Sequence, residues 1–372
     1  TKLEIRRSND LHTIDFSSLE CISDFVIEDH AISEDDYYAL LLLLTCTSDG
    51  SLLVFRGVDA DAFCDAGSTV VEDLNINGEL AAGETIDLSC ITEVTGRLEI
   101  KSTNALSVNL SGLIAVDDEV EIHDNLDLET IDLSNLLSVD GPVYVQSNNA
   151  LQTIDMSRLE SVDGQVRITD NPELETYEMG ALSTVEGRFE VNTNHKLETF
   201  NMDSLAEVNG EFEFVHNEGI KTISAPSLAE VTGNFYINNN YQAEDIQLPA
   251  LETVNSTINI NNNQELETIN LDSLYEIAGY FEFRNNYRVE LFNLPMLESV
   301  GGIFQIEDND DLLEILAPSL VHIGTKLEIR RSHDLHTIDF SSIGCVSDFV
   351  IEDHALSDAD YYALLTALTG GC

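Results

Sequence analysis

Apolar and polar positions repeat along the chain with a period of 23 residues. The segment DLETIDLSNLLSVDGPVYVQSNN begins at Asp127, and the similar segment ALQTIDMSRLESVDGQVRITDNP begins at Ala150. The spacing continues as far as Asp334, and one earlier repeat, from Ala105, has 22 residues. A fixed period of this length is typical of architectures in which each repeat forms one structural unit.

The apolar residues of the repeats fall into strict columns. One column holds leucine and a second holds valine or isoleucine, and two further columns, two residues apart, flank a polar position, as in GRFEVN. This alternation indicates a strand with one buried face, and LETIDL is too short and too β-branched for a helix. One turn cannot bury its own apolar residues, but stacked turns share a continuous core. The sequence therefore predicts a mainly β fold, a right-handed parallel β-solenoid with turns of about 23 residues. The leucine column is Leu136, Leu159, Leu182, Leu205, Leu228, Leu251, Leu274, Leu297 and Leu320.

Two polar columns accompany the apolar ones. Asparagine and glycine are favoured at tight corners, where the backbone adopts left-handed conformations and asparagine side chains bond to the backbone. We therefore expect both columns to be structural. The asparagines are Asn125, Asn148, Asn171, Asn194, Asn217, Asn240, Asn263, Asn286 and Asn309, and the glycine column is interrupted once, by Ser256.

The two ends of the chain repeat each other. Residues 1–45 and 325–369 align without a gap at an offset of 324 and differ at nine positions. In the second copy Ser357 and Asp360 form a helix-capping signal, and an apolar helical face follows at Tyr361, Leu364, Leu365 and Leu368. Because an open solenoid end exposes core and strand edges, these segments are predicted to be short helical caps linked by disulfides.

The repeated ends predict a division of the chain into modules. Residues 1–46 are interpreted as the last turn and C-terminal cap of a preceding solenoid, and residues 47–63 as a linker with the first strand of the next. Residues 64–372 then form a complete solenoid with caps at 64–90 and 345–372. The simplest explanation is a tandem array with a module of about 325 residues, from which this chain is a fragment cut out of phase.

Cysteines lie only near the ends of the repetitive region. Their even number and the absence of a C-x-x-C pair favour disulfide bonds and an oxidising, extracellular compartment. Local pairing is preferred, and it joins Cys21 to Cys46, Cys64 to Cys90, and Cys345 to Cys372.

The charge is strongly acidic. Sixteen lysines and arginines face 69 aspartates and glutamates, which gives a net charge of −53. Such a surface repels nucleic acid and anionic lipid, and it favours cations, basic partners or a saline medium. No apolar run approaches the roughly 20 residues of a membrane helix. Nucleic-acid binding and membrane insertion of this segment are therefore not expected.

Catalytic motifs are not found in the sequence. It contains no G-x-S-x-G, Walker loop, H-E-x-x-H or G-x-G-x-x-G, so we expect no enzymatic activity. His333 and His336 beside Asp334 are interpreted as a polar surface cluster rather than a zinc pair. No cofactor is implied except calcium, for which carboxylate clusters are candidates. These clusters hold Asp59, Asp61, Asp308, Asp310 and Asp311, and the candidate glycosylation sites are Asn109 and Asn255.

A family resemblance emerges from the columns and the terminal cysteines. The stretch CITEVTGRLEIKSTNALSVNLSGL from Cys90, followed by turns of the form L..L..V.G...I..N, resembles the receptor L domain. This is the leucine-rich-repeat-like β-solenoid of insulin- and EGF-receptor ectodomains, and fungal cell-wall proteins look similar. The resemblance covers most of residues 64–372, with residues 1–46 as a repeat of its end. It implies an extracellular receptor, wall or adhesive role, and it offers Cys46–Cys64 as an alternative disulfide.

The expected function is that of a non-enzymatic extracellular structural or adhesive module. It would build a filament, matrix, wall or cell-surface appendage from rigid solenoids placed end to end. Its partners would be copies or neighbouring modules of the same chain, cations, basic proteins or glycans. One alternative is a polysaccharide-acting β-helix enzyme. Another is a receptor ectodomain that binds its ligand on an exposed sheet face lined by Tyr144, Arg167, Glu190, Glu213, Tyr236 and Glu282.

Overall fold

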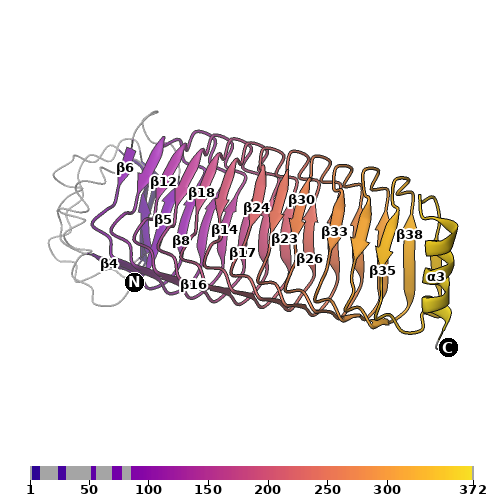
Figure 1. Cartoon of the computed structure of the whole chain (residues 1–372). Helices are drawn as coiled ribbons and strands as arrows, with labels where there is room; N and C mark the ends of the chain where they lie inside the picture. The colour runs from indigo at the N-terminus through magenta and orange to yellow at the C-terminus, as the bar shows by residue number, and fades with distance from the viewer. Residues whose placement is uncertain (1, 9–23, 31–51, 56–68, 78–84, 371–372) are drawn as a thin grey trace. The chain divides into compact units, whose positions relative to one another are not determined.

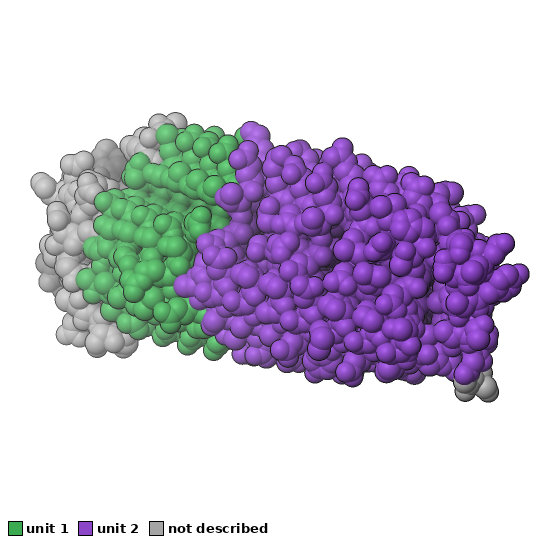
Figure 2. Space-filling view, viewed as in Figure 1, with its two compact units in different colours: residues 1–179 green, residues 180–372 purple. Residues whose placement is uncertain are grey.

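The computed structural model describes residues 2–8, 24–30, 52–55, 69–77 and 85–370, and for residues 2–8, 24–30, 52–55 and 77 it describes the backbone alone. The chain divides into two compact units, unit 1 (Thr1–Met179) and unit 2 (Gly180–Cys372), which Figure 2 distinguishes by colour. The predicted fold class is confirmed, because each unit is a parallel β-solenoid whose strands pair with their equivalents about 23 residues away. The predicted boundaries at residues 46 and 63 lie outside the described residues.

Each turn carries three short strands separated by corners (Figure 1). In the turn that begins at Val143 these are β14 (Val143–Gln146), β15 (Thr153–Asp155) and β16 (Ser161–Val162). We call the three series of equivalent strands row A, row B and row C, in that order. Pairing is parallel and in register, so that Val143 faces Val166 and Ile131 faces Ile154. The rows therefore follow from the repeat length, because each residue pairs with its equivalent one repeat away.

Unit 1 contains eighteen of the described strands. Row A comprises β1 (Lys2–Ser8), β2 (Asp24–His30), β3 (Leu52–Phe55), β5 (Asp73–Asn77), β8 (Leu98–Lys101), β11 (Val120–His123), β14 and β17 (Val166–Thr169). Row B comprises β6 (Thr85–Asp87), β9 (Ser107–Asn109), β12 (Thr130–Asp132), β15 and β18 (Thr176–Glu178). Row C comprises β4 (Val70–Val71), β7 (Glu93–Val94), β10 (Ala115–Val116), β13 (Ser138–Val139) and β16.

Unit 2 continues the same order of elements and ends in a helix. Row A comprises β20 (Phe189–Asn192), β23 (Phe212–Val215), β26 (Phe235–Asn238), β29 (Ile258–Asn261), β32 (Phe281–Arg284), β35 (Ile303–Glu307), β38 (Lys326–Arg330) and β40 (Phe349–Ile351). Row B comprises β21 (Thr199–Asn201), β24 (Thr222–Ser224), β27 (Asp245–Gln247), β30 (Thr268–Asn270), β33 (Leu291–Asn293), β36 (Glu314–Leu316) and β39 (Thr337–Asp339). Row C comprises β19 (Thr184–Val185), β22 (Glu207–Val208), β25 (Glu230–Val231), β28 (Thr253–Val254), β31 (Glu276–Ile277), β34 (Ser299–Val300) and β37 (His322–Ile323), and α3 (Asp358–Thr369) follows β40.

The core of each unit consists of the predicted apolar columns. All nine leucines of the leucine column are at most 1% exposed. The two row A columns are equally buried, and in unit 2 the aromatic rings of one column stack, with centroids 5.4 Å apart for Phe189 and Phe212 and 4.8 Å apart for Phe212 and Phe235. Stacking of like residues is possible because equivalent positions lie one strand spacing apart, about 4.8 Å.

The asparagine column is a buried hydrogen-bonded ladder. In unit 2 the Asn240 Nδ2 donates to the carbonyl of Phe214 at 2.9 Å, and the Asn240 Oδ1 accepts from the backbone N–H of Asn217 at 3.0 Å. Every member of the column is 0% exposed. Buried backbone N–H and carbonyl groups need hydrogen-bond partners. The asparagine side chains supply these partners at the corner where row A ends and the chain changes direction.

The left-handed backbone expected of these asparagines belongs to the residue before each of them. Positive φ angles occur at Ser147 (58°), Asp170 (57°), His216 (55°) and their equivalents, and not at the asparagine column itself. The sequence-based assignment of the left-handed conformation was therefore wrong by one residue. The asparagine is required for its amide group, while the preceding position turns the chain.

The predicted C-terminal helix is confirmed as α3. Ser357 is its N-cap, and the Ser357 Oγ accepts from the backbone N–H of Asp360 at 3.2 Å. Of the predicted apolar face only Leu364 and Leu368 are buried, whereas Tyr361 and Leu365 are partly exposed. Within the described residues, no helix has the length and apolar character needed to cross a membrane.

We expect Ser357→Ala to weaken the start of α3 by about 1 kcal/mol, because the backbone N–H of Asp360 loses its acceptor. Amide exchange measured by mass spectrometry should accelerate roughly 5-fold over the first helical turn. Ser357→Asn, which keeps a capping oxygen, is the control and should exchange as the unmodified chain does. Unchanged exchange in the alanine variant would show that the cap contributes nothing.

Candidate functional site

The outward-facing side chains of row A form a polar surface that contains carboxylates, amides, basic groups and tyrosines. The predicted binding residues occupy its central column, where Tyr144 pairs with Arg167 in unit 1, and Glu213 pairs with both Glu190 and Tyr236 in unit 2. Five of the six predicted residues are partly exposed. The structure therefore gathers these residues into one column within each unit, as the alternation of the strands requires.

Glu190 departs from the expectation of an exposed position. It is 5% exposed, because Arg188, two residues earlier on the same face, lies over it with an Nη1–Oε2 distance of 3.4 Å. Arg188 also pairs with Glu211 and Glu213 of the next turn. A buried carboxylate is tolerated only when it is paired, so Glu190 is part of an ion-pair network and not of an open binding surface.

The same arrangement occurs at two other places. Glu99 is 3% exposed beneath Arg97 and Lys101, and Glu328 is 9% exposed beneath Lys326 and Arg330. In all three cases a basic residue stands two positions before the glutamate, in RLE, RFE or KLE. That pattern is the sequence signal by which these covered carboxylates could have been found.

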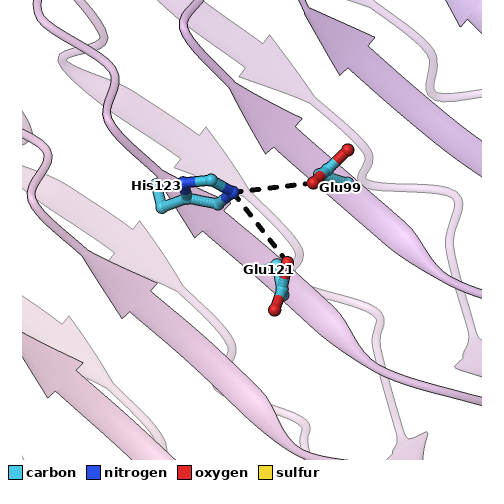
Figure 3. A group of neighbouring side chains, drawn as sticks. All are labelled: Glu99, Glu121 and His123. Carbon is cyan, nitrogen blue, oxygen red and sulfur yellow. Dashed lines mark ion pairs between the residues drawn. The ribbon is translucent and has the colours of Figure 1, made fainter.

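Glu99, Glu121 and His123 form the group in the described part of the chain that most resembles a metal site. Their ligand atoms all lie within 4.8 Å of one another. The His123 Nε2 is 3.6 Å from the Glu99 Oε1 and 3.9 Å from the Glu121 Oε2, and the side chains point toward one another from β8 and β11 (Figure 3). Sequence reasoning missed this group, which follows from the 22-residue offset between the two strands.

The oxygen atoms of this group are already bonded to cationic side chains. The Lys101 Nζ lies 2.7 Å and the Arg97 Nη2 2.9 Å from the Glu99 Oε1, and Arg97 also pairs with the Glu121 Oε2. Burial tends to raise the pKa of Glu99, but Lys101, Arg97 and His123 outweigh it and hold that pKa below its usual value. A metal ion would have to displace two cations, so the geometry is that of an ion-pair network.

Three of the aspartates predicted to bind calcium, Asp308, Asp310 and Asp311, lie within the described residues. Asp308 is bonded to Arg331 through both carboxylate oxygens, and Asp310 and Asp311 are exposed. Within the described residues, these three do not bring their oxygens as close together as the Glu99 group does. Asp59 and Asp61 lie outside the described residues, so their role stays a prediction.

The Arg331 guanidinium lowers the pKa of Asp308 by hydrogen bonding to its carboxylate. The pair therefore stabilises the fold above about pH 4, the range of an unperturbed aspartate, and this contribution is lost as the pH falls through the lower pKa of the folded state. We expect Arg331→Met to raise the pKa of Asp308, measured by NMR titration of labelled aspartate. Arg288→Met, whose partners are Glu265 and Glu267, is the control and should leave Asp308 unchanged. An unaltered Asp308 titration in Arg331→Met would contradict the assignment.

The two candidate glycosylation sites differ in their surroundings. The Asn109 Nδ2 donates to Asp87 at 3.0 Å within row B, whereas Asn255 is exposed at a corner and its Nδ2 donates to Glu230 at 3.0 Å. An oligosaccharyl group on Asn109 would disrupt an inter-strand contact. Asn255 is therefore the more accessible acceptor, and use of either site stays a prediction.

The predicted histidine pair and cysteines lie near the C-terminal cap and at the ends. His333 and His336 are both exposed, and their interpretation as a surface cluster stays a prediction. Cys90 and Cys345 each take part in a disulfide bond. Cys21, Cys46, Cys64 and Cys372 lie outside the described residues, so the choice between local pairing and Cys46–Cys64 stays a prediction.

Both units are β-solenoids of tandem repeats, and the resemblance to the receptor L domain rests on the sequence columns alone. No protein-family model and no curated protein matches this chain.

Proposed function

We propose that the chain is a non-enzymatic, extracellular structural or adhesive segment of a tandem array of L-domain-like solenoids. The observation that carries this proposal is the recurrence of one terminal structure at both ends of the chain. Strands β1 and β2 pair with Leu3 opposite Phe25, and β38 and β40 pair with the equivalent Leu327 opposite Phe349. Sequence and register are thus repeated together, as expected of consecutive modules of one design.

Rigid turns and an acidic surface support the same role. In each unit the strands are held by continuous backbone pairing and a core that runs from turn to turn, which suits a spacer that keeps its length. The charge of −53 disfavours close approach of copies side by side unless cations or basic partners lie between them. The array would therefore associate laterally through such partners and extend along the chain.

The experiment that tests the proposal is electron microscopy of the native, full-length protein from its source. We expect several solenoid modules in succession along one molecule, with a repeat that corresponds to about 325 residues. A native protein with one module followed by a membrane anchor would instead favour the receptor alternative.

Calcium is the cation that we propose to test first, because the surface carries exposed carboxylates at one strand spacing, among them Asp140 and Asp163 of unit 1. Like charges at this spacing repel unless they are screened or bridged. Millimolar calcium is expected to raise the Tm, measured by calorimetry, by more than an equal ionic strength of sodium chloride. Equal shifts in the two salts would show screening alone and would remove calcium from the proposal.

A second candidate function is binding of a neutral ligand to row A of unit 2. One stretch of that surface carries no charge, although the chain as a whole is strongly acidic, and it comprises Asn234, Tyr236, Asn238, Thr257, Asn259 and Asn261. Amide and hydroxyl groups beside an aromatic ring suit an uncharged glycan. A glycan array probed with the chain and with Tyr236→Ala would test this function, and equal binding by both would exclude the surface.

A further inference from the structure

We propose that the outer edge of β40 is a docking edge for a β-strand, and that its occupant is the segment equivalent to β3 in a following copy of this chain. Consecutive modules would then share one continuous row A. This inference rests on the tandem array proposed above and specifies the joint between its modules.

The chain holds two copies of the same edge. Residues Ser23–Ala31 and Ser347–Ala355 are identical in sequence, and so are the strands beside them, Lys2–Ser8 and Lys326–Ser332. In both copies the two strands pair in parallel at the same offset of 22 residues, with Ile5 opposite Ile27 and Ile329 opposite Ile351. Any difference between the two copies therefore comes from what lies next to them.

The two copies differ in their outer neighbour. In unit 1, β2 pairs with β3 at Asp24 and Leu52, and β3 in turn pairs with β5 at four positions from Leu52 to Phe55. In unit 2, β40 is the last strand of row A among the described residues. The strand also shortens from seven residues in β2 to three in β40. The sequence that forms β40 is thus the one that accepts a further strand where a module follows it.

The backbone of β40 offers hydrogen-bond donors on its outer side. The Glu352 N–H donates to the Ile329 carbonyl at 3.0 Å, toward β38. Successive amides of a strand point to opposite sides, so the N–H groups of Phe349 and Ile351 point away from β38. An edge of this kind is a template for strand addition, in which backbone bonds supply the affinity.

Helix α3 stands at this end of unit 2, beside the last row A strands (Figure 1). The Val346 N–H donates to the Leu368 carbonyl at 2.9 Å, and only Leu364 and Leu368 of the twelve helical residues are buried. Displacement of α3 to one side therefore exposes little apolar surface. We infer that α3 protects the edge at the end of an array and moves aside where the next module joins.

Hydrogen exchange in the chain itself tests the joint, because the two identical nine-residue segments have the same intrinsic exchange rates. Peptides that extend to Ile22 or to Val346 can be distinguished by mass. We expect the amide of Phe25 to exchange at least about 10-fold more slowly than that of Phe349. Phe25 lies where β2 pairs with β3, next to the Asp24–Leu52 position, whereas β40 has no outer strand among the described residues. Equal rates would overturn the proposed joint.

A two-module protein tests docking at β40 directly. In a chain in which residues 47–372 follow Cys372, the peptide that spans Val346–Ala355 occurs twice. Half of its population should gain protection at Phe349, the equivalent of Phe25, so that its mass envelope becomes bimodal. Val54→Pro in the second copy should abolish the slow half, whereas Val54→Ala, which keeps the backbone N–H, should retain it. A single fast population in the unmodified fusion would overturn the proposal.

These outcomes separate the joint from the array. Absence of protection at Phe25, together with a multi-module native protein, would leave the array standing and replace the strand joint by a flexible linker. A native protein with a single module would remove the array, whatever the exchange rates show.

Discussion

Replacement of Asn240 by leucine is expected to lower the free energy of unfolding by roughly 2–6 kcal/mol. The substitution removes the acceptor of the Asn217 N–H and the donor to the Phe214 carbonyl, and both groups stay buried. Each buried backbone group without a partner costs about 1–3 kcal/mol, and leucine supplies neither a donor nor an acceptor. The loss should fall on the contact between two turns, because each turn of a solenoid is held by its neighbours.

Urea-induced unfolding followed by circular dichroism measures this loss. Gln264→Ala, at an exposed position in a neighbouring turn, is the control and should change the free energy by no more than about 0.5 kcal/mol. Hydrogen exchange should show that the added opening is concentrated in the turns that contain Asn217 and Asn240. Equal stabilities of the Asn240→Leu and Gln264→Ala variants would show that the ladder is dispensable.

Phe212→Ala is expected to cost about 3–5 kcal/mol, the usual range for the loss of a buried phenylalanine. The ring is 0% exposed and lies between Phe189 and Phe235, with centroids 5.4 Å and 4.8 Å away. The neighbouring rings are fixed to paired strands, so they cannot close the space that alanine leaves. The cavity should therefore persist and contribute to the loss.

Phe212→Leu is the matched control, because Leu327 occupies the equivalent position of β38 and is fully buried there. We expect this variant to lose less than about 1.5 kcal/mol in the same urea experiment. If leucine cost as much as alanine, ring stacking and not the filled volume would be the dominant contribution of this column.

The arrangement of strands could be predicted from sequence because the same residue types recur at the same offsets. The leucine column and the alternating row A columns are read directly from the repeats, and their burial is what a stack of identical turns requires. The capping residue Ser357 could be predicted for a different reason, because an N-cap depends on one side chain and the residues next to it in sequence.

The conformation of the corner could not be predicted in the same detail. The left-handed position is occupied by residues as different as Ser147, His216 and Arg331, so no single residue type marks it. The asparagine that follows this position in nine turns gives the strong signal, but its side chain serves the hydrogen-bond ladder, and Ser332 follows Arg331 in its place. Only the backbone angles distinguish the two positions.

The sequence predicted which residues of row A share one outward-facing column. It did not predict which of their side chains are accessible. Alternation places Glu190 on the outer face, and the covering arginine that buries it, Arg188, directly precedes the strand β20 that carries Glu190. Likewise, Asp308 belongs to an acidic cluster in the sequence, but its oxygens face Arg331, 23 residues away. Long side chains decide such contacts, and a pattern of polar positions does not specify where their ends lie.

The constant 23-residue offset has a consequence for how such a molecule can change its length. If residues 218–240 were deleted, Asn217 would lie next to Asn263 in place of Asn240. Each apolar column would again stack residues of the same type, because the deletion removes one whole repeat. Duplication of the same interval would add a coil in the same way. The length of the solenoid thus changes in steps of about 4.8 Å, one step for each repeat gained or lost. Unequal recombination between repeats can make this change without a new sequence.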